Sequence, residues 1–370
     1  MKKGHNKVVD FGMRPFEELR TSTSTVMMYT NVIFNPEVIF KNIKLTEVDV
    51  PLTKKQKKID KKNLEAPYGA ILSVQSKTEI RGLNLRKKKK KWCTICSLIV
   101  MKGNKKQKVY TVTERIERNA GTDVLSILYD CSYCQTTYHP HQFGKISHFL
   151  NQLTIITSIG TKPFLNIMMF RDNIKFAGCK DPDDAVEAMI MLWQDYITKI
   201  PGAWSLKKGA TKPKFIIDVV MRNVDFKLGF PIQRKNLNML MNEECFSEHI
   251  FMSQYESTAH TNVNIKMYSV KPIDFKYDCL VIPLDDEPYF ITVSDLIYKK
   301  DKKKDLKQKY ITFIVFSSSE IILSGKYNQN MKDMYEFFIN IVFTHRKEIE
   351  EFTMAPDAQE IKKIFRLTQN

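Results

Sequence analysis

Four cysteines in this chain have the spacing of a metal site. They form two CxxC pairs separated by 34 residues: Cys93, Cys96, Cys131 and Cys134. This pattern is typical of a zinc ribbon, in which two turns bring four thiolates around one Zn²⁺ ion. His139 and His141 are alternatives for one ligand, but the four cysteines already complete a tetrahedral shell. We therefore expect structural zinc, with buried or redox-active thiols as the alternative; no neighbouring general base indicates catalytic zinc.

A polar insertion at residues 77–161 must hold these cysteines. It contains the basic run RKKKKKW and a strand-like stretch at residues 108–116, followed by DVLSILYDCSYC at residues 123–134. The zinc-ribbon pattern predicts a hairpin between the cysteine pairs. Such a polar segment has little apolar material for a core of its own, and a structural metal supplies folding free energy directly. The basic run is either a solvated approach to the hairpin or an arm that contacts phosphates.

The other cysteines and the chain's N-terminus bear on its compartment. Cys179, Cys245 and Cys279 are interpreted as ordinary thiols, and an odd total of seven cysteines favours a reducing compartment over a disulfide framework. The N-terminal MKKGHNKVVD has no apolar stretch behind it, so no signal peptide is predicted. No apolar run reaches the roughly 18 residues of a membrane span. The expected location is intracellular, with no membrane partner.

Net charge narrows the class of partner. The chain has 58 Lys and Arg against 41 Asp and Glu, a formal charge of +17. Such a balance favours a polyanion, nucleic acid before membrane, because basic side chains release phosphate counterions. A generally lysine-rich composition with solvated faces is the alternative. No glycine-rich phosphate loop, GxSxG or HExxH motif is present, so we do not expect an enzyme.

The elements around the insertion occur twice. NVIF at residues 31–34 matches NVDF at residues 223–226 with an offset of 192, and the same offset pairs Tyr68 with His260. A second pair of segments matches at an offset of 147: residues 162–180 and residues 309–326. The difference of 45 between the two offsets gives the first copy a longer loop. These matches predict a duplicated α+β unit.

Each copy is expected to run strand, helix, three strands, helix. The first copy is predicted to have strands at residues 23–34, 68–74, 164–170 and 174–177, and an amphipathic helix at residues 181–200. The second copy has the corresponding strands at residues 215–226, 262–268, 311–316 and 321–324, and a helix at residues 330–350. Helices on one side of an antiparallel sheet would leave its other face free.

This arrangement resembles the core of the TATA-binding protein family, a pseudo-two-fold saddle of two such repeats. SQYESTAHTNVNIKM (residues 253–267) is similar to the family's stirrup and following strand, and FIVFSSSEIILSG (residues 313–325) to its last hairpin. GFPIQRKNL (residues 229–237) is similar to its turn into a helix. The long first loop and the lysine bias look most like the TATA-binding-protein-like factors of nucleocytoplasmic large DNA viruses.

The resemblance implies a division of the chain into eight parts. These are an N-terminal tail (1–20), the first repeat in two parts (21–76 and 162–202) around the zinc-ribbon-like insertion (77–161), the second repeat in two parts (213–268 and 309–352) around a loop insertion (269–308), and a C-terminal tail (353–370).

In this family the concave sheet lies on the minor groove, and two phenylalanines per repeat enter between base steps and kink the duplex. The resemblance places Phe316, His260, Tyr68 and Met169 in these four places, and a shift of one residue in the first hairpin puts Phe170 where Met169 is. Since aromatic residues in alternating strands are more often core residues, a core role is the alternative.

Further residues of the DNA-binding face follow from the resemblance. The family's base-reading asparagines correspond to Thr23 and Met221, with Thr25 and Asn223 two residues on, so the central readout is altered. Glu320 replaces a phosphate-contacting lysine. The remaining members of the expected face are Ile167, Lys175, Ile314, Ile322 and Ser324.

The resemblance implies a transcription initiation factor. A monomer would bind A/T-rich double-stranded promoter DNA and recruit RNA polymerase and a B-type general transcription factor, the latter through Glu256. It would act in the host nucleus or a cytoplasmic viral factory, or be packaged in the virion. The alternative is a saddle-shaped protein-interaction platform that has lost DNA bending, which the altered phenylalanine positions and Glu320 favour.

Overall fold

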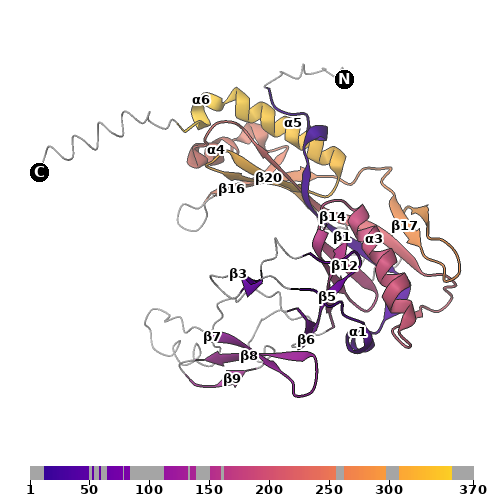
Figure 1. Ribbon diagram of the computed structural model, residues 1–370. Coiled ribbons are helices and arrows are strands. Elements are labelled where there is room, and N and C mark those ends of the chain that lie inside the picture. Colours follow the sequence, from indigo (N-terminus) through magenta and orange to yellow (C-terminus); the bar gives the residue numbers. More distant parts are fainter. Residues whose placement is uncertain are drawn as a thin grey trace, which may run out of the picture. The chain divides into compact units, whose positions relative to one another are not determined.

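The computed structural model describes residues 12–49, 52–53, 58–59, 65–77, 79–83, 112–131, 134–138, 151–159, 162–255, 262–296 and 308–351 (Figure 1). Antiparallel strands with a few helices make up these residues, which confirms the α+β class. The chain divides into two compact units. The N-terminal unit comprises residues 23–220 and 276–300, and the C-terminal unit comprises residues 1–22, 221–275 and 301–370.

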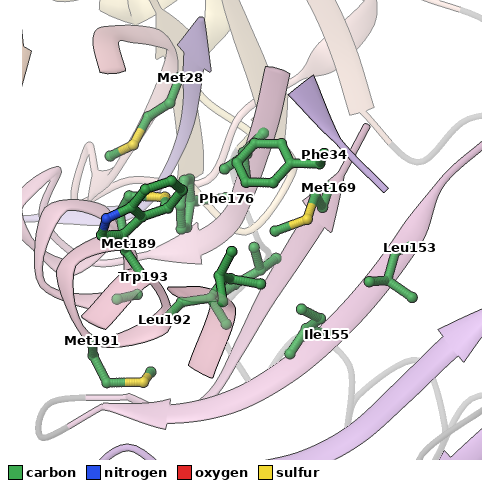
Figure 2. Close-up of a cluster of buried hydrophobic side chains, with 14 of the residues drawn as sticks. Met28, Phe34, Leu153, Ile155, Met169, Phe176, Met189, Met191, Leu192 and Trp193 are labelled. Carbon is green, nitrogen blue, oxygen red and sulfur yellow. The ribbon is translucent and has the colours of Figure 1, made fainter. Parts of the chain in front are cut away.

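Five antiparallel strands form the centre of the N-terminal unit. In their order across the sheet they are β5 (Ile71–Ser76), β10 (Leu153–Ile159), β11 (Lys162–Met169), β12 (Asn173–Cys179) and β1 (Thr21–Thr30). Helices α1 (Pro36–Asn42) and α3 (Asp183–Met191) contribute Ile39, Ala188 and Met189 to a core with alternate residues of these strands. Figure 2 shows this core around Trp193, which is 1% exposed.

Local hydrogen bonds fix the chain where these helices begin. Asn35 Oδ1 accepts a hydrogen bond from the Val38 N–H at 3.3 Å, and Pro36 follows in the first turn, where its missing N–H has no cost. At α3, Asp184 accepts from the N–H groups of Lys180 (2.6 Å) and Asp181 (3.2 Å). The helix predicted at residues 181–200 is confirmed as α3 followed by a π-helical turn (Leu192–Tyr196) and a 3-10 turn (Ile197–Lys199).

The C-terminal unit contains a second five-stranded antiparallel sheet. Its strands in order are β15 (Ile250–Tyr255), β16 (Asn262–Ser269), β19 (Lys309–Phe316), β20 (Glu320–Gly325) and the second half of β14 (Lys214–Lys227). Helices α4 (Arg234–Leu240), α5 (Asn328–Thr344) and α6 (Arg346–Ile349) supply the rest of its core. Figure 1 shows α4 and α5 on the same side of β16 and β20. Phe313 stacks on Phe338 of α5 with ring centroids 4.4 Å apart.

Most of the described insertion extends the first sheet beyond β5. The added strands continue the order as β6 (Glu79–Gly82), β8 (Val124–Cys131) and β7 (Val112–Arg118), and β9 (Thr137–Tyr138) pairs with β8. The β7–β8 hairpin confirms the predicted hairpin ahead of Cys131. Arg81 of β6 joins this extension to α1, because its guanidinium donates to the carbonyl oxygens of Lys41 (3.1 Å) and Ile43 (3.2 Å) at that helix's C-terminus.

The predicted insertion boundary of 77–161 is too wide. Strand β10 lies inside that range, yet it pairs with β5 on one side and β11 on the other. Leu153 and Ile155 of β10 are fully buried in the core of the N-terminal unit. Because its pairing is complete on both sides and Leu153 and Ile155 lie in the core while Thr154 and Ile156 are only partly buried, β10 is an integral strand of the unit.

Two other segments expected to be tails or loops are structured. Within the tail predicted at residues 1–20, a 3-10 turn (Phe16–Glu18) packs on α5, where Phe16 and Tyr335 have ring centroids 5.8 Å apart. The loop predicted at residues 269–308 contains a hairpin, β17 (Tyr277–Val281) and β18 (Tyr289–Val293), and β17 pairs with the first residues of β14. The remaining short strands pair as β2 (Val32–Phe34) with β13 (Trp204–Leu206) and β3 (Leu52–Thr53) with β4 (Lys58–Ile59).

Candidate nucleic-acid interface

Each five-stranded sheet has one face toward its helices and one face away from them, which we call the open face. In the N-terminal unit the side chains of β11 alternate between buried Leu165, Ile167 and Met169 and partly buried Asn166 and Met168. Strand geometry places residues that alternate in this way on opposite faces. Asn166 and Met168 therefore belong to the open face. Near β5, the buried Ala70 and Leu72 form a small cluster, and the partly buried residues packed against it are Val48, Ala66, Leu83, Ile156 and Phe164.

Cross-strand pairs give the order of side chains on the open face of the N-terminal unit. Two rows run from β1 across β12, β11 and β10 to β5: Met27, Lys175, Met168, Thr154, Gln75; and Thr25, Ala177, Asn166, Ile156, Ser73. Lys175 is the one charged member of these rows. Gly178, with φ of +91°, lies where the pairing of β1 with β12 shifts by one residue, and glycine adopts that conformation without strain.

The open face of the C-terminal unit has two corresponding rows. They run from β14 across β20, β19 and β16 to β15: Asp225, Ile322, Ile314, Asn264, Gln254; and Asn223, Ser324, Thr312, Lys266, Met252. Their members therefore include the expected residues Asn223, Ile314, Ile322 and Ser324. This face carries both signs of charge, whereas the rows of the N-terminal unit carry only a lysine.

Polar side chains on the C-terminal open face are paired in part. Ser324 Oγ donates to Asn223 Oδ1 at 2.8 Å, and Lys227 forms an ion pair with Glu320 at 2.9 Å across β14 and β20. Glu320 thus has a lysine partner on its own sheet. Asn264 Oδ1 is buried and accepts no hydrogen bond from the described residues. The oxygen and nitrogen of this amide can exchange places by a flip, which would bring its N–H₂ group to the buried position instead.

The two hairpins that border these faces differ in turn length. In the N-terminal unit Met169 pairs with Ile174, so the turn between Phe170 and Asn173 has two residues. In the C-terminal unit Val315 pairs with Ile321, so the turn between Phe316 and Glu320 has three residues, Ser317 to Ser319. Counted from the paired residues, Phe170 and Phe316 occupy the same place: both follow the last buried strand residue and both are partly buried.

This register corrects two expected site residues. Met169 and Ile167 are both fully buried in the core on the helix side of the sheet, and Figure 2 shows Met169 among those side chains. A constant offset of 147 matches Met169 with Phe316 and Ile167 with Ile314. Because the first turn is one residue shorter, the offset along β11 is 146, which matches Phe170 with Phe316 and Met168 with Ile314. The expectation for Met169 and Ile167 is wrong, and the alternative residue, Phe170, has the place equivalent to Phe316.

Tyr68 is also in a different environment from the one expected. It is 58% exposed in the loop before β5, beside Glu187 of α3 and Asp195. The pKa of Tyr68 is raised to about 12. The largest cause is partial desolvation of the phenol, and the hydrogen bond with Glu187 and the negative charge of Glu187 contribute less. Tyr68 thus contacts the helix that covers the other face. By strand order, β10 corresponds to β16, and β5 corresponds to β15. Tyr68 precedes β5 in the sequence, whereas His260 precedes β16, so the offset of 192 compares residues beside strands that do not correspond.

The asparagines that match at an offset of 192 have unlike roles. Asn31 is 3% exposed, donates to the Lys212 carbonyl at 2.9 Å and accepts from the Lys214 N–H at 2.9 Å. It fixes the start of β14. Asn223 instead lies on an open face, and its counterpart by strand register is Thr25, 198 residues earlier. Thr23 is partly buried on β1, before the register shift.

Cys131 and Cys134 are the described residues of the cysteine motif. Cys131, which is 2% exposed, ends β8, and its N–H donates to the Thr136 carbonyl at 3.1 Å; Cys134 lies in the turn between them. Gln135 has φ of +53°, which closes the turn. Cys93, Cys96, His260 and Glu256 lie outside the described residues. Among the residues that are described, no three potential ligands come together.

Several open-face residues escaped sequence reasoning. Asn166, Met168, Asn264 and Lys266 belong to the rows, and the period-two alternation of their strands was the signal that could have found them. An aromatic group also lies at the end of the C-terminal rows: Phe251 is 4.6 Å from Tyr310 and 5.8 Å from Tyr268 between ring centroids. Exposed rings of this kind can stack on nucleobases.

The sequence matches no protein-family model, and no curated protein is found as a relative. No helix among the described residues has the length and apolar content needed to cross a bilayer.

Proposed function

We propose that the two units are copies of one fold and together form a TATA-binding-protein-like saddle that binds promoter DNA in the minor groove. The observation that carries the proposal is the matching strand order, β5-β10-β11-β12-β1 and β15-β16-β19-β20-β14, with helices on one face of each sheet. The equivalent places of Phe170 and Phe316 support it further.

The chemistry of the open faces suits a minor groove. Phe170 and Phe316 supply apolar rings that can enter between base steps and kink the duplex. The amides of Asn166, Asn223 and Asn264 can donate to the adenine N3 and thymine O2 acceptors that line this groove. Lys175 and Lys266 can contact phosphates, which adds salt-dependent affinity.

In this proposal the protein is a transcription initiation factor with a B-type general transcription factor and RNA polymerase as partners. Glu256 is the proposed contact for the B-type factor, and His260 is a proposed third kinking residue beside Phe170 and Phe316; both are assigned by the sequence resemblance alone. Nuclear, viral-factory or virion localisation follows from the same resemblance.

A structural Zn²⁺ ion is proposed for the cysteine motif. The buried Cys131 ends β8 and the partly buried Cys134 follows three residues later, a CxxC spacing that suits two ligands of a tetrahedral site, and Cys93 and Cys96 would complete it. The metal would supply folding free energy to the end of the β7–β8 hairpin. Purified protein should contain one zinc per chain, and Cys131→Ser should lower both the metal content and the protease resistance of this hairpin. Protein without zinc, or no change in the variant, would contradict the assignment.

A second candidate function is a protein-interaction platform. Asp225 lies exposed on the C-terminal open face, and Glu320 already neutralises Lys227 there, so this face attracts phosphates less than the face with Lys175. DNA bending would then be lost while the fold persists.

Energy transfer between dyes at the two ends of a short duplex separates the two functions. The initiation-factor proposal predicts increased transfer on an A/T-rich duplex, little on a scrambled duplex, and loss of the increase in Phe170→Ala and Phe316→Ala. Phe290→Ala is the matched control, since Phe290 is 56% exposed on β18, a strand outside the four rows of the open faces. Equal binding to both duplexes without bending would favour the platform.

A further inference from the structure

Strand β18 forms an unprotected sheet edge in the N-terminal unit. Among the described residues it pairs only with β17. The register has no bulge and runs from the pair formed by Tyr277 and Val293 to the pair formed by Val281 and Tyr289. The backbone N–H and C=O groups on the side of β18 away from β17 thus have no strand partner there. Such a row of groups can pair with another extended chain.

The side chains of β18 lack the usual protection of an edge. Its sequence, YFITV, has no charge and no proline, the two devices that most often prevent edge pairing. Tyr289 is 42% exposed and Phe290 is 56% exposed. Lys212 lies over the Tyr289 ring at 5.9 Å, and the Phe290 ring is on the opposite face of the strand. The edge therefore offers one aromatic anchor on each of its faces.

The loop that leads into β18 is acidic. Asp285, Asp286 and Glu287 are consecutive and exposed, and the exposed Leu284 precedes them, with 62% of its surface accessible. This concentration of carboxylates contrasts with the net charge of +17 of the whole chain. Three adjacent carboxylates repel phosphates, so a nucleic acid does not suit this surface. They attract a chain that carries lysine or arginine.

We propose that β18 and the acidic loop before it are a docking edge for an extended, basic segment of a partner protein. The segment adds to the sheet as a strand, its backbone bonds to the outer edge of β18, and its basic residues face Asp285, Asp286 and Glu287. Alternate apolar residues of the segment pack against Phe290 and Tyr289. A second copy of this chain suits the edge less well, because antiparallel pairing of two β18 strands would bring the acidic loop of one copy beside Asp295 of the other.

A designed peptide tests this edge on the full-length protein. The probe has about nine residues, long enough for an average strand, and alternates lysine with valine or threonine. Two matched peptides carry glutamate in place of lysine, or N-methyl groups on alternate backbone nitrogens. Binding is measured by fluorescence anisotropy. The lysine peptide should bind, and both matched peptides should bind much more weakly, because one lacks the charge and the other cannot complete the strand pairing.

Protein variants locate the binding. Replacing the three acids together (Asp285→Asn, Asp286→Asn, Glu287→Gln) should weaken the lysine peptide by about tenfold through loss of three exposed charge contacts. Phe290→Lys should weaken it further, and hydrogen exchange of β18 amides should slow when the peptide binds. Phe316→Ala should leave peptide binding unchanged, which separates this proposal from the DNA-binding one.

Three results would overturn the proposal. The N-methylated peptide could bind as well as its parent, which would mean that charge alone holds it. The acid replacements could have no effect. Finally, sedimentation could show a dimer that Phe290→Lys dissociates, in which case a second copy occupies the edge.

Discussion

The two hairpins β11–β12 and β19–β20 differ by one residue in their turns, and that residue decides which side chains reach an open face. The shorter turn of the N-terminal unit is held by β1 and β2, since the Phe34 N–H donates to the Arg171 carbonyl at 2.8 Å and the Thr30 N–H to the Asp172 carbonyl at 3.4 Å. The longer turn instead uses Ser319 at φ of +69°. A shift of one residue exchanges the two faces of a strand, so Phe170 and Met169 trade roles.

The largest expected difference in stability is between the variants Met169→Ala and Phe170→Ala. Met169→Ala removes a fully buried side chain, and we expect the N-terminal unit to lose about 2–5 kcal/mol of unfolding free energy. Phe170→Ala removes a partly buried ring at the edge of the core and should cost less. Urea denaturation of both variants measures the difference. If Met169→Ala were the milder change, the register that places Met169 in the core would be wrong.

That comparison also shows what the sequence could and could not predict. The α+β class, the helix from Asp183, the β7–β8 hairpin and most of the second copy follow from local patterns and turn residues. The place of β10 does not, because its partners β5 and β11 are set by pairing across the sheet, and a fixed offset assumes equal turns and loops. Adjacent Ile155 and Ile156 interrupt the apolar–polar alternation of LTIITSI, and the two offsets predict that it belongs to the insertion. Tyr68, Ile167 and Met169 were misplaced for the same reason.

The second comparison is between Asn31 and Asn223. Asn31→Ala leaves the Lys212 carbonyl and the Lys214 N–H without their side-chain partner in a buried site, which should cost about 1–3 kcal/mol. Asn223→Ala removes one partly buried hydrogen bond with Ser324 and should cost about 1 kcal/mol or less. Denaturation midpoints of the two variants test the order. Equal losses would mean that the two asparagines have equivalent roles after all.

Tyr335 and Tyr68 should contribute differently to the stability of the protein at alkaline pH. Burial, followed by the negative charge of Glu336, raises the pKa of Tyr335 to about 12. The folded state then holds the phenol proton more tightly than the unfolded state, whose tyrosine has a pKa of about 10. This stabilisation is complete below about pH 10 and is lost as pH rises through about 12. Tyr68 has a pKa raised to the same value but is 58% exposed, so its contribution should be smaller.

Phenylalanine variants test this contrast. Tyr335→Phe should make unfolding free energy less dependent on pH between about 10 and 12, and Tyr68→Phe should change that slope less. Tyr335→Phe also loses the bond from its hydroxyl to the Arg14 carbonyl, so its stability at neutral pH should fall. Absorbance of the phenolate during titration gives an independent reading. An unchanged alkaline slope in Tyr335→Phe would exclude this tyrosine as the cause.

The smallest expected effect comes from the turn itself. Ser319 adopts a left-handed conformation that costs a residue with a Cβ about 1–2 kcal/mol, whereas glycine adopts it freely. Ser319→Gly should therefore stabilise the C-terminal unit, by about 1 kcal/mol or less because glycine is also more flexible in the unfolded chain. Ser318→Gly is the control, since Ser318 has no positive φ and gains only the added flexibility; it should destabilise slightly. Thermal unfolding of the two variants measures the change in stability, which should be positive for Ser319→Gly and negative for Ser318→Gly. Changes of the same sign would show that the left-handed conformation of Ser319 does not destabilise the turn.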